Sequence, residues 1–203
     1  YRESKDRFNE SLEVIQKAWT QQSVSHQGRF YRFDEVVVVP KPYQRPMPPI
    51  RIAAASTDTF AAIGTMGFPI FVAVRYETAE EILPWLQVYR DAWKAAGHPG
   101  HGEVHLRVPG YIAATEAAAR EEPRESLMHF FDQQAKLLSD SARRLNLPPT
   151  DRRAITAKRL SELSYGEALN RTILVGTPDE VATRLRRLKD QLGLAGVMLE
   201  LNC

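Results

Sequence analysis

The chain has 203 residues, of which 43% are hydrophobic and 9% aromatic, which is enough to bury a core and predicts a globular protein. Its 27 Lys and Arg residues nearly balance its 25 Asp and Glu residues, so the formal charge of +2 gives no field that would favour a nucleic acid or a membrane as partner. No apolar run approaches the ~20 residues of a membrane span, and the charged amino end is unlike a signal sequence, so we expect a cytoplasmic protein. The only cysteine is Cys203, which leaves neither an intrachain disulfide nor a cysteine-based metal cluster to expect.

The first fifty residues predict a helix, a hairpin and an extended connector. Apolar residues recur every three or four positions over residues 4–20, which predicts one amphipathic helix. Residues 24–39 are rich in β-branched and aromatic side chains, with turn-like sequences at 26–28 and 33–35, and predict a small hairpin. Five prolines in residues 40–49 make that segment extended and unable to join a central ladder. We therefore expect residues 24–49 to form a hairpin and proline-rich excursion.

Strands and helices then alternate. An apolar strand over 50–54 is followed by a helix near 59–66, which Gly67 ends. A second strand over 70–74 leads into a long helix over 78–96. This order predicts a βαβα repeat.

The second half continues the pattern. Residues 104–114 predict a strand, and Pro109-Gly110 inside it predicts a bend or bulge. Residues 116–144 and 151–163 read as helical, separated by a proline break.

A clear helix start follows near the end of the chain. Thr177 is a cap, Pro178 takes the first helical position and Glu180 completes a capping box. This helix is expected to stop at Gly193, before an apolar strand over 197–201.

Four strands that alternate with helices predict an α/β fold with a parallel sheet and right-handed crossovers. Four strands cannot close a barrel, and the order helix first, strand last favours the later half of a (β/α)8 TIM-type barrel over an open doubly wound sheet. We expect residues 1–203 to form one incomplete domain. The strands near Ile50, Ile70, Val108 and Val197 should lie side by side and parallel in that order.

The turn after the first of these strands is a candidate anion site. Residues 54–59, Ala-Ala-Ser-Thr-Asp-Thr, have only small or short polar side chains where a helix begins, so several backbone N–H groups are free to meet a phosphate. Tight packing is the alternative explanation for such a turn. We expect no metal site, because His98 and His101 belong to a loop at the amino-terminal side of the next strand.

Five passages, in this order, point to a family. They are RFNESLEVIQKAW, GRFYRFDEVVVVPKPYQRPMPPI, AAASTDTFAA, GFPIFVAV, and VGTPDEVATRL with LGLAGVMLELN. Together they resemble the flavin-dependent, bacterial luciferase-like monooxygenases over nearly the whole chain. Members of that family are (β/α)8 barrels, so the resemblance implies that this chain supplies the fifth to eighth strands.

The resemblance also implies where a flavin binds. In such enzymes the turn after the fifth strand binds the flavin phosphate, and the end of the sixth strand lies against the isoalloxazine ring. The phosphate contacts carry over to Ala54, Ala55, Ser56 and Thr57, and the ring contacts carry over to Ala73 and Val74. The catalytic histidine of the family belongs to the first half of the barrel, so no catalytic residue is assigned here.

The resemblance implies an oxidoreductase: a monooxygenase that uses reduced FMN, supplied by a separate flavin reductase, and O2 to oxygenate a small organic substrate. Two alternatives stay open, an F420-dependent reductase on the same barrel and a non-catalytic flavin-binding or assembly fragment. Half a barrel by itself is expected to be inactive. Because it leaves an unpaired strand edge and an exposed apolar face, we also expect a homo-oligomer.

Overall fold

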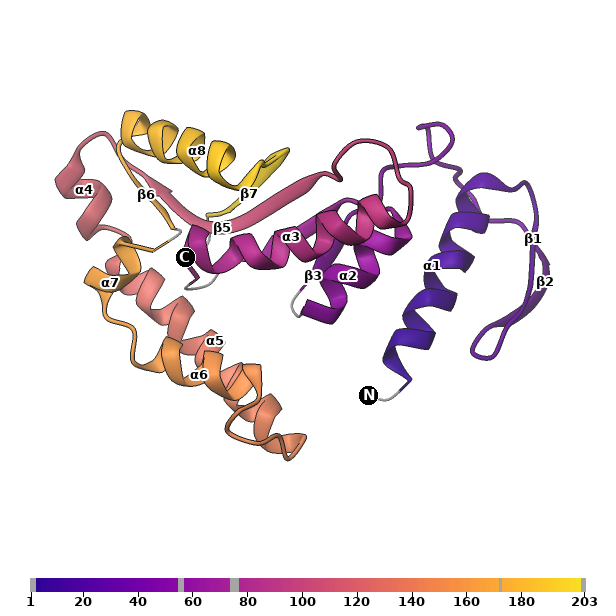
Figure 1. Cartoon of the computed structure of the whole chain (residues 1–203), viewed down its shortest axis with the longest axis horizontal. Helices are drawn as coiled ribbons and strands as arrows, with labels where there is room; N and C mark the ends of the chain where they lie inside the picture. The colour runs from indigo at the N-terminus through magenta and orange to yellow at the C-terminus, as the bar shows by residue number, and fades with distance from the viewer. Residues whose placement is uncertain (1–2, 55–56, 74–76, 172, 202–203) are drawn as a thin grey trace. The chain divides into compact units, whose positions relative to one another are not determined.

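The computed structural model describes residues 3–54, 57–73, 77–171 and 173–201. They form two compact units, residues 1–50 and residues 51–203, which Figure 1 colours from indigo to purple and from purple to yellow. Within the described ranges, no helix is both long enough and apolar enough to cross a membrane.

The first unit is a helix followed by a hairpin. Helix α1 (Ser4–Thr20) has the predicted bounds. Strands β1 (Val24–Gln27) and β2 (Arg32–Val36) pair antiparallel, which confirms the predicted hairpin.

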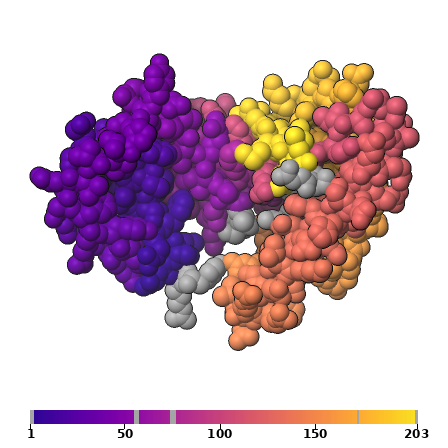
Figure 2. All heavy atoms as spheres, turned by 180° about the vertical axis from the view of Figure 1, so that it is seen from behind, coloured from indigo at the N-terminus to yellow at the C-terminus, as the bar shows by residue number. Residues whose placement is uncertain are grey.

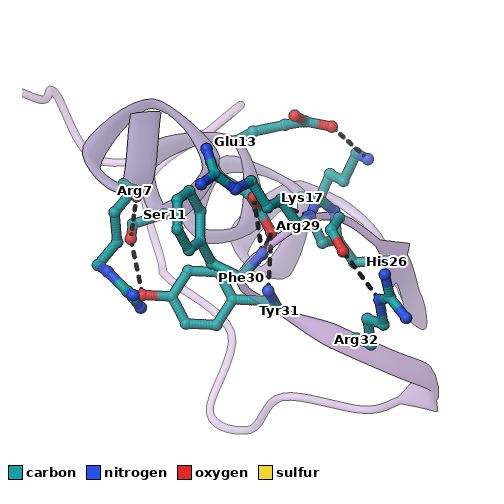
Figure 3. A network of polar contacts seen from close by, with 11 residues as sticks. Arg7, Ser11, Glu13, Lys17, His26, Arg29, Phe30, Tyr31 and Arg32 are labelled. Atoms are coloured by element: carbon teal, nitrogen blue, oxygen red, sulfur yellow. Dashed lines mark hydrogen bonds and ion pairs between the residues drawn. The ribbon is translucent and has the colours of Figure 1, made fainter. Parts of the chain in front are cut away.

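Glu10 fastens the hairpin turn to α1. Its carboxylate accepts the backbone N–H groups of Arg29 (3.1 Å), Phe30 (3.0 Å) and Tyr31 (2.7 Å), and Figure 3 shows these turn residues around the helix. The Nε2 atom of the buried His26 lies 3.2 Å from the same carboxylate. Burial opposes ionisation, but the hydrogen bonds from the turn and from His26 outweigh it and lower the pKa of the Glu10 carboxyl. The ionised carboxylate therefore holds the hairpin on the helix.

The predicted turn at residues 33–35 is wrong, because these residues lie inside β2. Glu35 has a φ of 50°, and its N–H donates to the Ser25 hydroxyl at 2.9 Å. The pairing register shifts at the same place, between Val24 and His26. The turn-forming residues therefore make a β-bulge within the hairpin, where one residue adopts the left-handed conformation.

The second unit is built on five parallel strands. They are β3 (Ile52–Ala54), β4 (Ile70–Ala73), β5 (Val104–Ile112), β6 (Leu174–Gly176) and β7 (Gly196–Glu200). The order β3-β4-β5-β7 is parallel throughout, which confirms the predicted α/β class and strand order. The sequence does not predict β6, a strand of three residues. At Pro109-Gly110, where the sequence predicts a bend or bulge, β5 changes partner from β7 to β6.

The two faces of this sheet differ. Alternate strand residues are buried on one face: Ile52, Ala54, Ile70, Val72, Val104, Leu106 and Val108. The helices that connect the parallel strands, α2 (Thr57–Met66), α3 (Ala79–Ala95) and α8 (Pro178–Leu192), carry the buried apolar side chains that this face needs. The opposite residues are half-buried or exposed, and we call their face the open face: Ala53, Phe71, Ala73, His105, Arg107, Met198 and Glu200. The yellow atoms of β7 lie at the surface in Figure 2, in line with the 48% exposure of Met198.

Among the described residues, four helices separate β5 from β6. They are α4 (Glu116–Glu121), α5 (Arg124–Arg144), α6 (Arg152–Ser161) and α7 (Tyr165–Leu169). The predicted helical region over 116–144 is split, because Pro123 lacks the N–H that would continue the ladder. These helices share a core of their own, formed by Leu127, Phe131, Ala135, Leu160, Leu163, Tyr165 and Ala168 with Ile173 and Val175 before and within β6.

Helix α8 begins and ends as predicted. The Thr177 hydroxyl accepts the Glu180 N–H, and the Glu180 carboxylate accepts the Thr177 N–H at 2.7 Å. Gly193 ends the helix with a φ of 62°, a left-handed conformation that favours glycine.

Candidate functional site

Two of the six predicted flavin contacts lie fully within the described residues. Ala54 is the last residue of β3 and is buried, and Ala73 is the last residue of β4 and is half-buried. Ala55, Ser56 and Val74 lie outside the described residues. Thr57 is described as the first residue of α2, without its side chain. The phosphate and ring contacts therefore stay predictions.

The fold brings the carboxyl ends of β3 and β4 together. The two strands are neighbours, with Ala54 paired to Val72, so their last residues meet at one edge of the sheet. Helix α2 begins three residues after Ala54. Its first-turn N–H groups therefore belong to the same edge, which is the edge where parallel α/β folds bind ligands.

Close packing fixes the position of α2. Phe60 and Ile63 are buried. A Cβ built on Gly64 would lie 2.3 Å from the main-chain oxygen of Tyr89 in α3, so only glycine permits the observed approach. Asp58, exposed in the first turn of α2, interacts favourably with the helix dipole and adds a negative charge near the predicted phosphate position.

Arg107 is a functional candidate that the sequence reasoning missed. It pairs in register with Ala73 on the neighbouring strand, so both residues belong to the open face. Its guanidinium forms an ion pair with Glu200 of β7, whose side chain is 18% exposed. A charged residue between the apolar residues Leu106 and Val108 was the available signal. The neighbour of Arg107 depends on strand register, which the sequence does not reveal.

Tyr111 adds a proton donor near the carboxyl end of β5. Its hydroxyl donates to the Glu122 carboxylate at 2.6 Å. This hydrogen bond, together with burial, raises the pKa of the Tyr111 phenol above its ordinary value.

A second polar cluster lies at the amino end of the sheet. The Arg51 Nε atom donates to His105 Nε2 at 2.9 Å, and Glu103 lies 3.2 Å from the same ring nitrogen. The ring of Phe71 packs against His105, with 5.3 Å between ring centroids. Since the amino end of parallel strands carries stability rather than chemistry, we assign this cluster a structural role. Among the described residues, no group of three or more His, Cys, Asp or Glu side chains could hold a metal ion.

The geometry so far defines an α/β protein whose parallel sheet brings the carboxyl ends of β3 and β4 together at one edge. A family model described as luciferase-like monooxygenase matches residues 1–195, so the chain belongs to the luciferase-like monooxygenase family.

Individual relatives are more distant. The chain is 26% identical over 190 residues to an FMNH2-dependent dimethylsulfone monooxygenase from Pseudomonas putida, a match that covers 90% of this chain and 50% of that protein. Among solved structures it is similar to the monooxygenase RslO1 from Streptomyces bottropensis, with 28% identity, a TM-score of 0.67 and coverage of 98% and 54% of the two chains.

One further neighbour shows the fold alone. The F420-dependent tetrahydromethanopterin reductase from Methanopyrus kandleri has a TM-score of 0.68 at 14% identity, and the match covers 95% of this chain and 56% of that one. These matches cover most of this chain but only about half the length of each of these relatives.

Proposed function

We propose that the protein is a flavin-dependent monooxygenase that uses reduced FMN and O2 to oxygenate a small organic substrate. The observation that carries this proposal is the luciferase-like match over residues 1–195. It is supported by the two relatives named FMNH2-dependent dimethylsulfone monooxygenase, at 26% and 25% identity. In this proposal β3, β4, β5 and β7 are the fifth to eighth strands of a (β/α)8 barrel.

The residues at the carboxyl edge fit a flavin. Ala73, which is half-buried on the open face, has the smallest side chain besides glycine and leaves room for a ring to approach the backbone, and Ala54 is equally small but buried. In our proposal the backbone N–H groups of residues 54–57 and the hydroxyls of Ser56 and Thr57 hold the phosphate. Ala73 and Val74 lie against the ring.

Bound reduced flavin would supply the electrons that activate O2. The chain itself then binds, orients and excludes water. Arg107 would present guanidinium N–H donors beside Ala73, and Glu200 would hold the guanidinium in place and balance its charge. Donors held there suit a strongly polar group of the flavin or the substrate.

An F420-dependent reductase is the second candidate. Solved structures of F420-dependent enzymes have TM-scores of 0.68 and 0.63 with this chain, at 14% and 13% identity, so they support the fold for either cofactor. A non-catalytic flavin-binding fragment is the third candidate. We also propose a separate flavin reductase and a homo-oligomer as partners of the monooxygenase.

Oxygen consumption separates these candidates. The intact protein is supplied with a flavin reductase, FMN and a panel of small organic substrates, in parallel with reduced F420 and the same panel. The monooxygenase predicts substrate-dependent O2 consumption with FMN and none with F420. Turnover with F420 in the absence of O2 would favour the reductase, and flavin binding without turnover on any substrate would favour the non-catalytic fragment.

A further inference from the structure

A small cavity lies in the groove where α8 packs against α3, on the helical side of the sheet. Its volume is about 180 Å³, many times the ~10–15 Å³ that one water molecule needs. The polar residues that line it are Thr78, Glu80, Asn170, Arg171, Arg184, Arg187 and Gln191. Ala54 and Ala73, the two proposed flavin contacts that the structure fully describes, are not among them.

The charge in this cavity is unbalanced. Three arginines, Arg171, Arg184 and Arg187, line it with one acidic residue, Glu80. The Glu80 carboxylate already has partners. It accepts hydrogen bonds from its own N–H and from the Thr78 hydroxyl, and these bonds lower the pKa of the carboxyl. The positive charge of Arg187 lowers this pKa further. Among the residues that line the cavity, cations therefore outnumber carboxylates, while Glu81 and Glu180 lie near Arg171 and Arg184 outside the lining.

Arg184 is held in place by main-chain atoms. Its guanidinium donates to the carbonyl oxygens of Leu169 (3.1 Å) and Arg171 (3.0 Å) at the end of α7. Carbonyl oxygens fix a guanidinium without cancelling its charge. Burial lowers the pKa of Arg184, and Glu180 is the carboxylate that counteracts this. Arg184 is therefore a fixed and partly desolvated cation, and desolvation strengthens its attraction for an anion.

Two carboxylates, those of Glu81 and Glu167, interact with Arg171. Its guanidinium lies 3.6 Å from Glu81, and Arg159 lies 3.5 Å from the same carboxylate. The carboxylate of Glu81 also accepts the Thr78 N–H at 2.9 Å. Two arginines thus share one carboxylate whose oxygens are already in use.

We propose that this cavity, lined by Arg171, Arg184 and Arg187, binds a phosphate group. A tetrahedral dianion offers several oxygens to guanidinium groups that approach from different elements, and guanidinium matches phosphate oxygens in pairs. Gln191 adds an amide side chain to the same lining. The group can be free inorganic phosphate or the terminal phosphate of a small monoester.

The test compares two arginines on one helix. Both are exposed, but Arg187 lines the cavity and its neighbour Arg186 does not. Thermal unfolding of the intact protein is followed while inorganic phosphate is titrated at constant ionic strength, with sodium chloride as the balancing salt. Wild type and Arg186→Gln should show the same saturable rise in midpoint, as a ligand of the native state requires. Arg187→Gln should lower the affinity for phosphate about tenfold or more, and Arg187→Lys should lower it less.

Parallel titrations identify the source of the phosphate. Equal affinity for inorganic phosphate and glycerol 3-phosphate would identify the ligand as the terminal phosphate of a monoester. Binding of inorganic phosphate alone would identify it as the free ion. FMN affinity, measured by fluorescence, should be unchanged in Arg187→Gln whether or not the monooxygenase proposal holds. Three results would overturn the phosphate site: no saturable effect in wild type, equal losses in Arg186→Gln and Arg187→Gln, or a parallel loss of FMN affinity.

Discussion

Replacing Gly64 by Ala tests whether tight packing of α2 on α3 positions the carboxyl edge. The new Cβ would lie 2.3 Å from the Tyr89 main-chain oxygen, where ordinary contacts are 3.4–4 Å, and 3.0 Å from the Ala92 Cβ. The clash is with a backbone atom, which cannot rotate away as a side chain can. We therefore expect the clash to cost about 3 kcal/mol, the upper end of the ~1–3 kcal/mol range for overpacking. Alanine recovers about 1 kcal/mol of helix propensity. The net loss is about 2 kcal/mol, or ~4–8 °C for a domain of this size.

Gly166→Ala is the matched control, because Gly166 also lies in a helix and a Cβ there would meet no atom within 4 Å. It should stabilise the protein by ~0.5–1 kcal/mol. Urea unfolding of the intact protein, followed by circular dichroism, gives both midpoints. FMN affinity should fall only in Gly64→Ala, since α2 must shift. Equal stabilisation by the two substitutions would refute the packing argument.

Three further changes test other parts of the structure. Thr57→Ala should weaken the binding of FMN about tenfold or more and the binding of riboflavin far less. The reason is that a charge-assisted hydrogen bond, worth about 1.5–3 kcal/mol, is lost only for the ligand with a phosphate. Equal losses of affinity in fluorescence titrations would show that the phosphate binds elsewhere. The folded pKa of Glu10 lies below its unfolded value of about 4.3, so its stabilisation is present above that pH and is lost as pH falls through the folded pKa. The urea midpoint of wild type should therefore fall in acid more steeply than that of Glu10→Gln, and parallel pH profiles would count against the anchor. Thr177→Ala should cost about 1 kcal/mol of unfolding free energy, whereas Thr177→Ser should retain most of it, and an unchanged midpoint in Thr177→Ala would remove the capping box from the account.

Local signals in the sequence were sufficient where local physics decides the structure. The helix over 4–20 follows from its apolar period, and the start of α8 follows from Thr177 and Glu180, which bond to each other within one turn. The order of the parallel strands follows from their alternation with helices and the single hand of the crossovers. These features need no knowledge of distant contacts.

The remaining features depend on partners that are distant in sequence. Strand β6 has three residues, too few to show a period, and exists because residues 110–112 of β5 offer it an edge. The bulge at Glu35 has the composition of a turn and differs only in what lies opposite, the Ser25 hydroxyl. The position of Arg107 beside Ala73 is set by strand register. For the candidate site, the sequence leads to a prediction of the edge at which a ligand binds, but it does not reveal which charged groups meet there.

The ligand preference of the unmodified protein tests the central claim most directly, that a phosphate-bearing flavin binds at the carboxyl edge of this sheet. Equilibrium fluorescence titrations of the intact protein are performed with FMN, riboflavin and F420 under identical conditions. The account predicts that FMN binds more tightly than F420 and at least about tenfold more tightly than riboflavin. A tenfold ratio corresponds to ~1.4 kcal/mol, and one charge-assisted hydrogen bond is worth more than that. Equal affinity for FMN and riboflavin, or a preference for F420, would contradict it.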